Sequence, residues 1–196
     1  MLAQADRWDE PTRAVITTRL HALPPIRFFT PAEEAGAKAL LDLLMGQDQE
    51  PGEGIDLVRI VDGRLAEHET DGWHYDTMPP DDQAWRNSLA GLDDDAREAH
   101  GRVFPDCEPA QQRAVLQAVQ SMGDDRWHDM AAAAVWSLWT RYAASAFYSH
   151  PAAWNEIGFS GPAYPRGYKN IGVDKLEPYE VHDASPRDDP AAGGAR

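Results

Sequence analysis

The sequence lacks the residues from which most protein-bound redox centres are built. It contains one cysteine, Cys107, in 196 residues, so the chain alone can form neither an intrachain disulfide, nor a cysteine-rich zinc site, nor an iron–sulfur cluster. The neighbouring carboxylates of Asp106 and Glu108 raise the pKa of a thiol rather than activating it. We therefore expect Cys107 to be a buried or inert thiol.

The sequence also lacks the common motifs of cofactor binding and nucleophilic catalysis. It has no G-x-G-x-x-G fingerprint, phosphate loop, H-E-x-x-H or G-x-S-x-G. Its seven histidines are dispersed, and none forms a pair three or four residues apart on a predicted helix. We accordingly assign no catalytic residue, no cofactor-binding residue and no metal ligand to this chain.

Long apolar runs and an excess of positive charge are absent too. The most apolar stretch, residues 131–146, is interrupted by Arg141 and is shorter than the roughly 20 residues needed to span a bilayer. The formal net charge is -15, from 33 acidic and 18 basic residues, and it repels phosphate backbones and anionic lipids. We expect neither nucleic-acid binding nor direct membrane insertion.

Strand signals are scarce, whereas helical periodicity is frequent, which predicts an all-α protein. Thr30, Pro31 and Glu33 form a helix-start signal in which Thr30 caps the helix and Glu33 completes a capping box. Apolar spacing and glycine stops predict helices over residues 30–45, 55–65, 80–99, 109–122 and 125–148. A further helical turn is expected near residues 152–157.

These elements predict a single helical bundle of about five to six helices with extended N- and C-terminal arms. We place an N-terminal arm at residues 1–27 and the bundle at 28–150. Prolines and glycines after Pro151 rule out a long helix, yet this stretch is rich in aromatic residues, so residues 151–180 are expected to be an extended arm that packs on a surface. Residues 181–196 lack large apolar side chains and are expected to be a disordered acidic tail.

The tryptophans divide into two groups by their position in this pattern. Trp85, Trp127 and Trp139 lie on apolar helical stripes and are expected in the core. The tryptophans expected at an interface are Trp73, Trp136 and Trp154.

The order of several short motifs resembles the gluconate 2-dehydrogenase subunit 3 family of small helical subunits, over roughly residues 28–168. The first motifs are Phe29-Thr30-Pro31-Ala32-Glu33, Pro51-Gly52 and Gly91-Leu92-Asp93. The more specific ones follow a long aromatic-rich helix: Tyr148-Ser149-His150-Pro151, then residues 155–162 (NEIGFSGP), then Pro165-Arg166-Gly167-Tyr168.

This resemblance implies a non-catalytic small subunit that binds and stabilises an FAD-dependent catalytic subunit of the glucose-methanol-choline (GMC) type, acting on a sugar, polyol or glycoside. The FAD and the substrate site would then belong to the partner, and a cytochrome c or another electron acceptor would be reached through that complex. Relatives often carry a twin-arginine export signal, which residues 1–25 lack. We expect a cytoplasmic location, or a periplasmic one only if the partner carries the signal.

We assign partner binding to the arm because its aromatic residues need a surface to cover. The glycines permit tight or left-handed turns, the prolines stiffen the chain, and the aromatic side chains act as anchors. Glu156 caps local amides or pairs with a cation of the partner. The assigned partner-binding residues are Trp154, Glu156, Gly158, Phe159, Gly161, Pro162, Tyr164, Gly167 and Tyr168.

Three alternatives stay open on the sequence alone. The aromatic arm packs back on its own bundle instead of on a partner. The chain is a stand-alone helical scaffold or chaperone with another client. In the third alternative, His74, Asp76 and His128 serve as acid–base groups or metal ligands of an independent enzyme.

Overall fold

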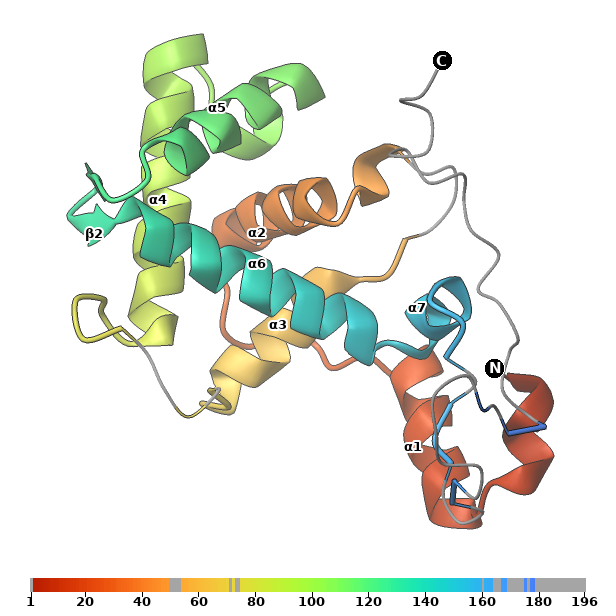
Figure 1. The fold of residues 1–196 in the computed structure, drawn as a ribbon. Coiled ribbons are helices and arrows are strands. Elements are labelled where there is room, and N and C mark those ends of the chain that lie inside the picture. The colour runs from red at the N-terminus through yellow and green to blue at the C-terminus, as the bar shows by residue number, and fades with distance from the viewer. Residues whose placement is uncertain are drawn as a thin grey trace. The chain divides into compact units, whose positions relative to one another are not determined.

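The computed structural model describes residues 2–49, 54–70, 72, 75–159, 161–163, 167–168, 175 and 177–178. The chain divides into two compact units (Figure 1). The central unit is Pro24–Phe147, and the terminal unit combines Met1–Leu23 with Tyr148–Arg196.

The described residues form seven α-helices and one very short hairpin, which confirms the all-α prediction. The central unit contains α2 (Pro31–Leu44), η2 (Gln47–Gln49), α3 (Leu57–Ala66), α4 (Asp81–His100), η3 (Phe104–Asp106), α5 (Pro109–Ser121), β1 (Arg126–Trp127), β2 (Met130–Ala131) and most of α6 (Ala132–Ser149). The terminal unit contains η1 (Leu2–Arg7), α1 (Glu10–His21), α7 (Pro151–Glu156) and the last two residues of α6.

Local start and stop signals place most helices where the sequence predicts them. The Thr30 hydroxyl accepts a hydrogen bond from the Glu33 amide (3.3 Å), and the Glu33 carboxylate accepts one from the Thr30 amide (2.8 Å). This capping box starts α2 as expected. After α2 and α4, Gly46 and Gly101 adopt φ values of 70°, the left-handed conformation that commonly ends a helix.

The predicted helix over residues 125–148 starts seven residues too early. Residues 126–131 form a hairpin in which Trp127 pairs with Met130, and α6 begins at Ala132. The two turn residues, His128 and Asp129, have φ of 43° and 61°, as a type I′ turn requires. The Asp95 carboxylate accepts hydrogen bonds from Trp127 Nε1 (2.7 Å) and binds His128 Nε2 (2.8 Å), so a long-range contact overrides the helical pattern.

The N-terminal segment contains helices that the sequence analysis did not identify. Asp9 caps α1 by accepting a hydrogen bond from the Thr12 amide (3.0 Å), and Pro11 occupies its first turn. Ile16 is the buried residue of α1, so the helix presents no apolar stripe of the kind that periodicity detects.

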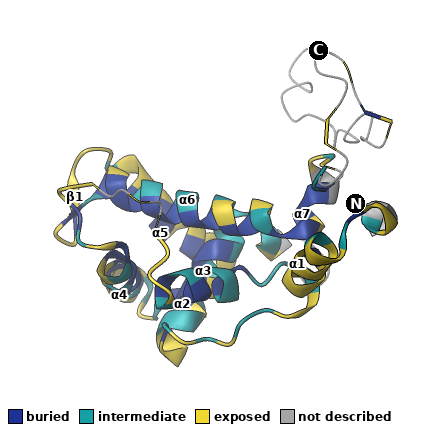
Figure 2. Cartoon of the chain, turned by 90° about the horizontal axis from the view of Figure 1, so that it is seen from below, coloured by how far each residue is buried: buried dark blue, intermediate teal, exposed yellow. Residues whose placement is uncertain are grey.

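Aromatic and aliphatic side chains fill the core of the central unit. Figure 2 colours the buried residues of its helices dark blue. Trp85, Trp127 and Trp139 are at most 4% exposed, which confirms their predicted core positions. Trp85 lies edge-on to Phe29 and Tyr142, with ring centroids 6.0 and 5.7 Å apart. Such edge-to-face contacts are favourable arrangements of aromatic rings.

A fully buried carboxylate, that of Asp62 in α3, fixes the chain that leads into α2. One of its oxygens accepts the amide hydrogen of Arg27 (2.7 Å), and the other accepts those of Phe28 (2.9 Å) and Phe29 (2.8 Å). Three backbone donors at the entrance to α2 are thereby satisfied away from water.

Among the helices of the described part of the chain, none is both long and apolar enough to cross a bilayer.

Candidate functional site

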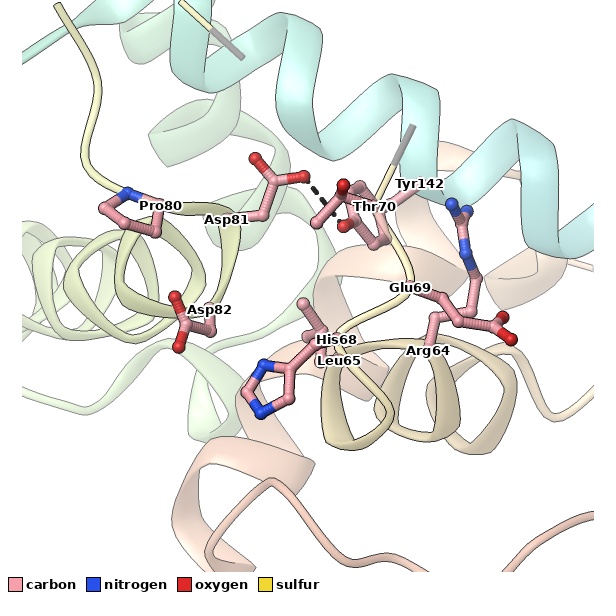
Figure 3. A pocket seen from close by; sticks show the side chains of 9 residues that line it. All are labelled: Arg64, Leu65, His68, Glu69, Thr70, Pro80, Asp81, Asp82 and Tyr142. Carbon is pink, nitrogen blue, oxygen red and sulfur yellow. Dashed lines mark hydrogen bonds between the residues drawn. The ribbon is translucent and has the colours of Figure 1, made fainter. Parts of the chain in front are cut away.

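A pocket of about 180 Å³ in the central unit gathers polar side chains from the end of α3, the start of α4 and the middle of α6 (Figure 3). It is lined by Arg64, Leu65, His68, Glu69, Thr70, Pro80, Asp81, Asp82 and Tyr142. Its volume is below the roughly 300 Å³ at which small-molecule sites begin.

Asp81 and Tyr142 form the buried hydrogen bond of this pocket. The Tyr142 hydroxyl donates to the Asp81 carboxylate over 2.8 Å, and the two residues are 0% and 6% exposed, respectively. Burial, followed by the hydrogen bond to Asp81 and the charge of Asp81, raises the pKa of Tyr142 well above its ordinary value. The hydroxyl therefore remains a proton donor to Asp81 at neutral pH.

Two arginines surround this pair. The guanidinium of Arg64 lies 4.7 Å from the centroid of the Tyr142 ring, and that of Arg141 lies 5.5 Å from it. Arg141 Nη2 also lies 3.7 Å from the Asp81 carboxylate. These cation–π and ionic contacts connect α3, α4 and α6. The arrangement therefore holds three helices together, and the Tyr142 hydroxyl keeps its proton.

No described contact brings together the three residues that an independent enzyme would use, His74, Asp76 and His128. His74 lies outside the described residues, Asp76 is exposed, and His128 pairs with Asp95 at the hairpin. Within the described part of the chain, no group of three or more His, Cys, Asp or Glu side chains is placed to hold a metal ion. Cys107 is 6% exposed, and burial, the largest cause, raises the pKa of its thiol, as expected for an inert cysteine.

The residues predicted to bind a partner lie in the terminal unit, where Trp154 is already covered. Trp154 is 7% exposed and belongs to a small core with Trp8 and Ile16, which are 4% and 2% exposed. Its indole Nε1 donates to the Tyr148 carbonyl over 2.9 Å. Trp154 therefore organises the terminal unit from inside rather than offering its ring to solvent.

Phe159 and Tyr168, by contrast, are 37% and 51% exposed. The Phe159 ring lies edge-on to the Trp154 ring, with centroids 5.2 Å apart, so an exposed aromatic side chain rests directly on the small core. Glu156 ends α7, and its side chain and all of Tyr164 lie outside the described structure.

The glycines of this segment, which the sequence analysis expected to permit tight or left-handed turns, have positive φ angles. Gly158, Gly161 and Gly167 have φ of 71°, 95° and 70°, values that side chains with a Cβ rarely adopt. The carbonyl of Pro162 accepts a hydrogen bond from Trp8 Nε1 (3.2 Å). The turns thus bring this part of the chain back toward the N-terminal segment.

Exposed large apolar side chains are concentrated in the terminal unit. Among the described residues, six large hydrophobic side chains are exposed, and five of them lie in this unit: Val15, Tyr148, Ile157, Phe159 and Tyr168. The sixth, Tyr75, lies in the central unit. Three of the six, Ile157, Phe159 and Tyr168, are close together in the sequence, and exposed apolar side chains of this kind are candidates for an interaction surface.

Sequence reasoning missed the N-terminal half of this unit. Trp8 and Ile16 stand in a segment with little periodicity, and their partner Trp154 is more than 130 residues away in the chain. The cap at Asp9 with Pro11 behind it was the local signal that could have indicated α1.

Comparison with known proteins adds one match. The family model described as gluconate 2-dehydrogenase subunit 3 matches residues 31–161, which is more than half of the chain. No curated protein and no solved structure matches the chain.

Proposed function

Because the chain belongs to the gluconate 2-dehydrogenase subunit 3 family, we propose that it is a non-catalytic small subunit that binds and stabilises an FAD-dependent catalytic subunit of the GMC type. In this proposal the FAD and the substrate site are in the partner, which oxidises a sugar, polyol or glycoside. The chain contributes a binding surface and no reacting group.

The distribution of exposed apolar side chains supports this proposal most directly. Ile157, Phe159 and Tyr168 are 50%, 37% and 51% exposed within a short stretch. We call the described residues of this stretch, 154–159, 161–163 and 167–168, the docking segment. Aromatic anchors surrounded by polar surface are the usual energetic centres of protein interfaces. The family match extends to residue 161, so Ile157 and Phe159 lie inside it and Tyr168 lies beyond it.

We expect the neighbouring gene to encode the GMC-type flavoprotein. The test is co-expression of this chain with the product of that gene, followed by purification through a tag on the small subunit. We expect the two chains to purify together, with the absorbance spectrum of bound flavin and with dehydrogenase activity. A small subunit that purifies alone would contradict the proposal, and one that retains another client would favour the stand-alone scaffold.

Substitutions in the docking segment sharpen this test. Phe159→Ala and Tyr168→Ala should each weaken the affinity for the catalytic subunit by about tenfold, because each removes an aromatic anchor. Tyr75→Ala is the matched control, since Tyr75 is 43% exposed but lies in the central unit. Equal effects at positions 75 and 168 would show that the docking segment has no special role.

A further inference from the structure

The two ends of the chain form one structure that is only partly covered by the family match. Trp8 and Ile16, from residues 1–23, pack against Trp154, with Ala5 and Leu20 beside them. The match begins at residue 31, so Trp8 and Ile16 lie outside it, whereas Trp154 lies inside it. The helices α1 and α7 lie side by side (Figure 1).

Hydrogen bonds attach the N-terminal segment to both ends of the stretch that carries α7. At one end, the Arg19 guanidinium donates to the Ser149 carbonyl over 3.5 Å. At the other end, Trp8 Nε1 donates to the Pro162 carbonyl over 3.2 Å. The N-terminal segment therefore holds the chain at Ser149 and at Pro162, on both sides of Trp154.

This stretch has little internal means of holding a single conformation. The helix α7 has 6 residues, far below the roughly 12–15 residues at which an isolated helix becomes even marginally stable. Left-handed glycines at 158 and 161 follow it, and glycine has a large conformational entropy to lose on ordering. The contacts with Trp8 and Ile16 supply the order that the local sequence does not.

The exposed Phe159 depends on the same contacts. Its ring rests on the Trp154 ring at a centroid distance of 5.2 Å, and Trp154 is packed against Trp8 and Ile16. A loss of the N-terminal contacts would release Trp154 and, with it, the support of the Phe159 ring.

We propose that the N-terminal segment, residues 5–20, is an intramolecular brace that holds the docking segment in its binding conformation. This inference rests on the proposed function and adds that Trp8 and Ile16 are positioning residues for partner binding. Without the brace, the docking segment loses its conformational entropy when it binds the partner instead of when the chain folds. This entropy cost lowers the affinity for the partner.

The test compares neighbouring residues of α1 in the full-length chain. Ile16 is 2% exposed and faces the core, whereas Val15 is 53% exposed. Ile16→Ala should weaken binding to the FAD-loaded catalytic subunit by roughly ten- to a hundredfold, and Val15→Ala should leave it unchanged. Trp8→Phe keeps a ring but removes the hydrogen bond to Pro162, and a smaller loss is expected.

A double-mutant cycle separates positioning from general damage. Phe159→Ala should reduce affinity less in the Ile16→Ala background than in the unmodified chain, because the Phe159 ring is already unsupported there. Ile16→Val should restore most of the affinity. Circular dichroism of each variant checks that the overall helical content of the chain is retained.

The possible outcomes distinguish the two proposals. If the unmodified chain does not bind the catalytic subunit, the proposed function fails and the brace fails with it. If the unmodified chain binds and Ile16→Ala binds equally well, the brace alone is overturned. If Val15→Ala weakens binding as much as Ile16→Ala, α1 contacts the partner directly, and the brace is again overturned.

Discussion

At the scale of single residues, the clearest test of the fold concerns Asp62. Its carboxylate is fully buried and accepts three backbone hydrogen bonds. In Asp62→Asn, an amide NH₂ group replaces one of the two carboxylate oxygens. This NH₂ group then faces a backbone N–H and cannot accept a hydrogen bond from it. We expect the free energy of unfolding to fall by about 3 kcal/mol, measured by urea denaturation.

The control for this substitution is the same change at an exposed aspartate. The Asp94 side chain is 64% exposed and pairs with Arg97 on the surface of α4. Asp94→Asn should therefore change the free energy of unfolding by less than about 1 kcal/mol. Similar losses of unfolding free energy in both variants would mean that the three hydrogen bonds to Asp62 stabilise the fold no more than the surface ion pair of Asp94 does.

At the scale of elements, the start of α7 depends on a neutral histidine. His150 Nδ1 accepts a hydrogen bond from the Ala152 amide over 3.2 Å, which caps the helix. Burial lowers the pKa of His150, and a hydrogen bond with the Arg19 backbone opposes this effect. A protonated Nδ1 cannot accept the Ala152 hydrogen, so α7 requires the neutral form.

The pKa direction gives the sign of the pH dependence. A histidine with a lowered pKa in the folded state binds a proton more readily when unfolded, so the terminal unit loses stability as the pH falls below about 6.5. As the pH falls through this range, hydrogen exchange of the α7 amides should become faster relative to that of an unstructured peptide at the same pH. In His150→Asn, whose side chain caps helices without titrating, the rate relative to unstructured peptide should stay constant.

The other histidine of the described terminal segments provides the comparison. His21 is exposed at the end of α1, and His21→Asn should retain the pH dependence of the α7 amides. If this substitution abolishes the pH dependence and His150→Asn does not, the cap at α7 is not the titrating element.

Elements with local start and stop signals could be predicted from the sequence, and those held by distant contacts could not. The capping box at Thr30 and Glu33 and the glycine after α2 lie within or beside the helix they define. The hairpin at residues 126–131 depends instead on Asp95, about thirty residues earlier in the chain. A helical pattern over residues 125–148 carries no information about that contact.

The same limit applies to the candidate site. Glycines, prolines and aromatic residues after Pro151 indicated a segment with a surface to cover, and the exposed Phe159 and Tyr168 lie there. The burial of Trp154 by Trp8 and Ile16 joins opposite ends of the chain. Neither end contains a sequence pattern that identifies the other end as its partner. This contact could therefore not be predicted from the sequence.

At the scale of the whole molecule, the two units differ in how much apolar surface supports them. The central unit buries a continuous set of large side chains, including Trp85, Trp139 and Tyr142 at 0% exposure. The hydrophobic cluster of the terminal unit contains three buried residues, Trp8, Ile16 and Trp154. At about 1.5–3 kcal/mol for each buried large side chain, this cluster offsets the ordering entropy of only a few residues.

This difference predicts that the terminal unit opens more readily than the central unit and that a partner closes it. In the isolated chain, amides of α1 and α7 should exchange with deuterium at least tenfold faster than those of α4 and α6, because their opening exposes a small core. Adding the catalytic subunit should slow exchange in α1 and α7 selectively. Hydrogen exchange followed by mass spectrometry measures both states, and uniform protection of the two units would contradict the assignment of binding to the terminal unit.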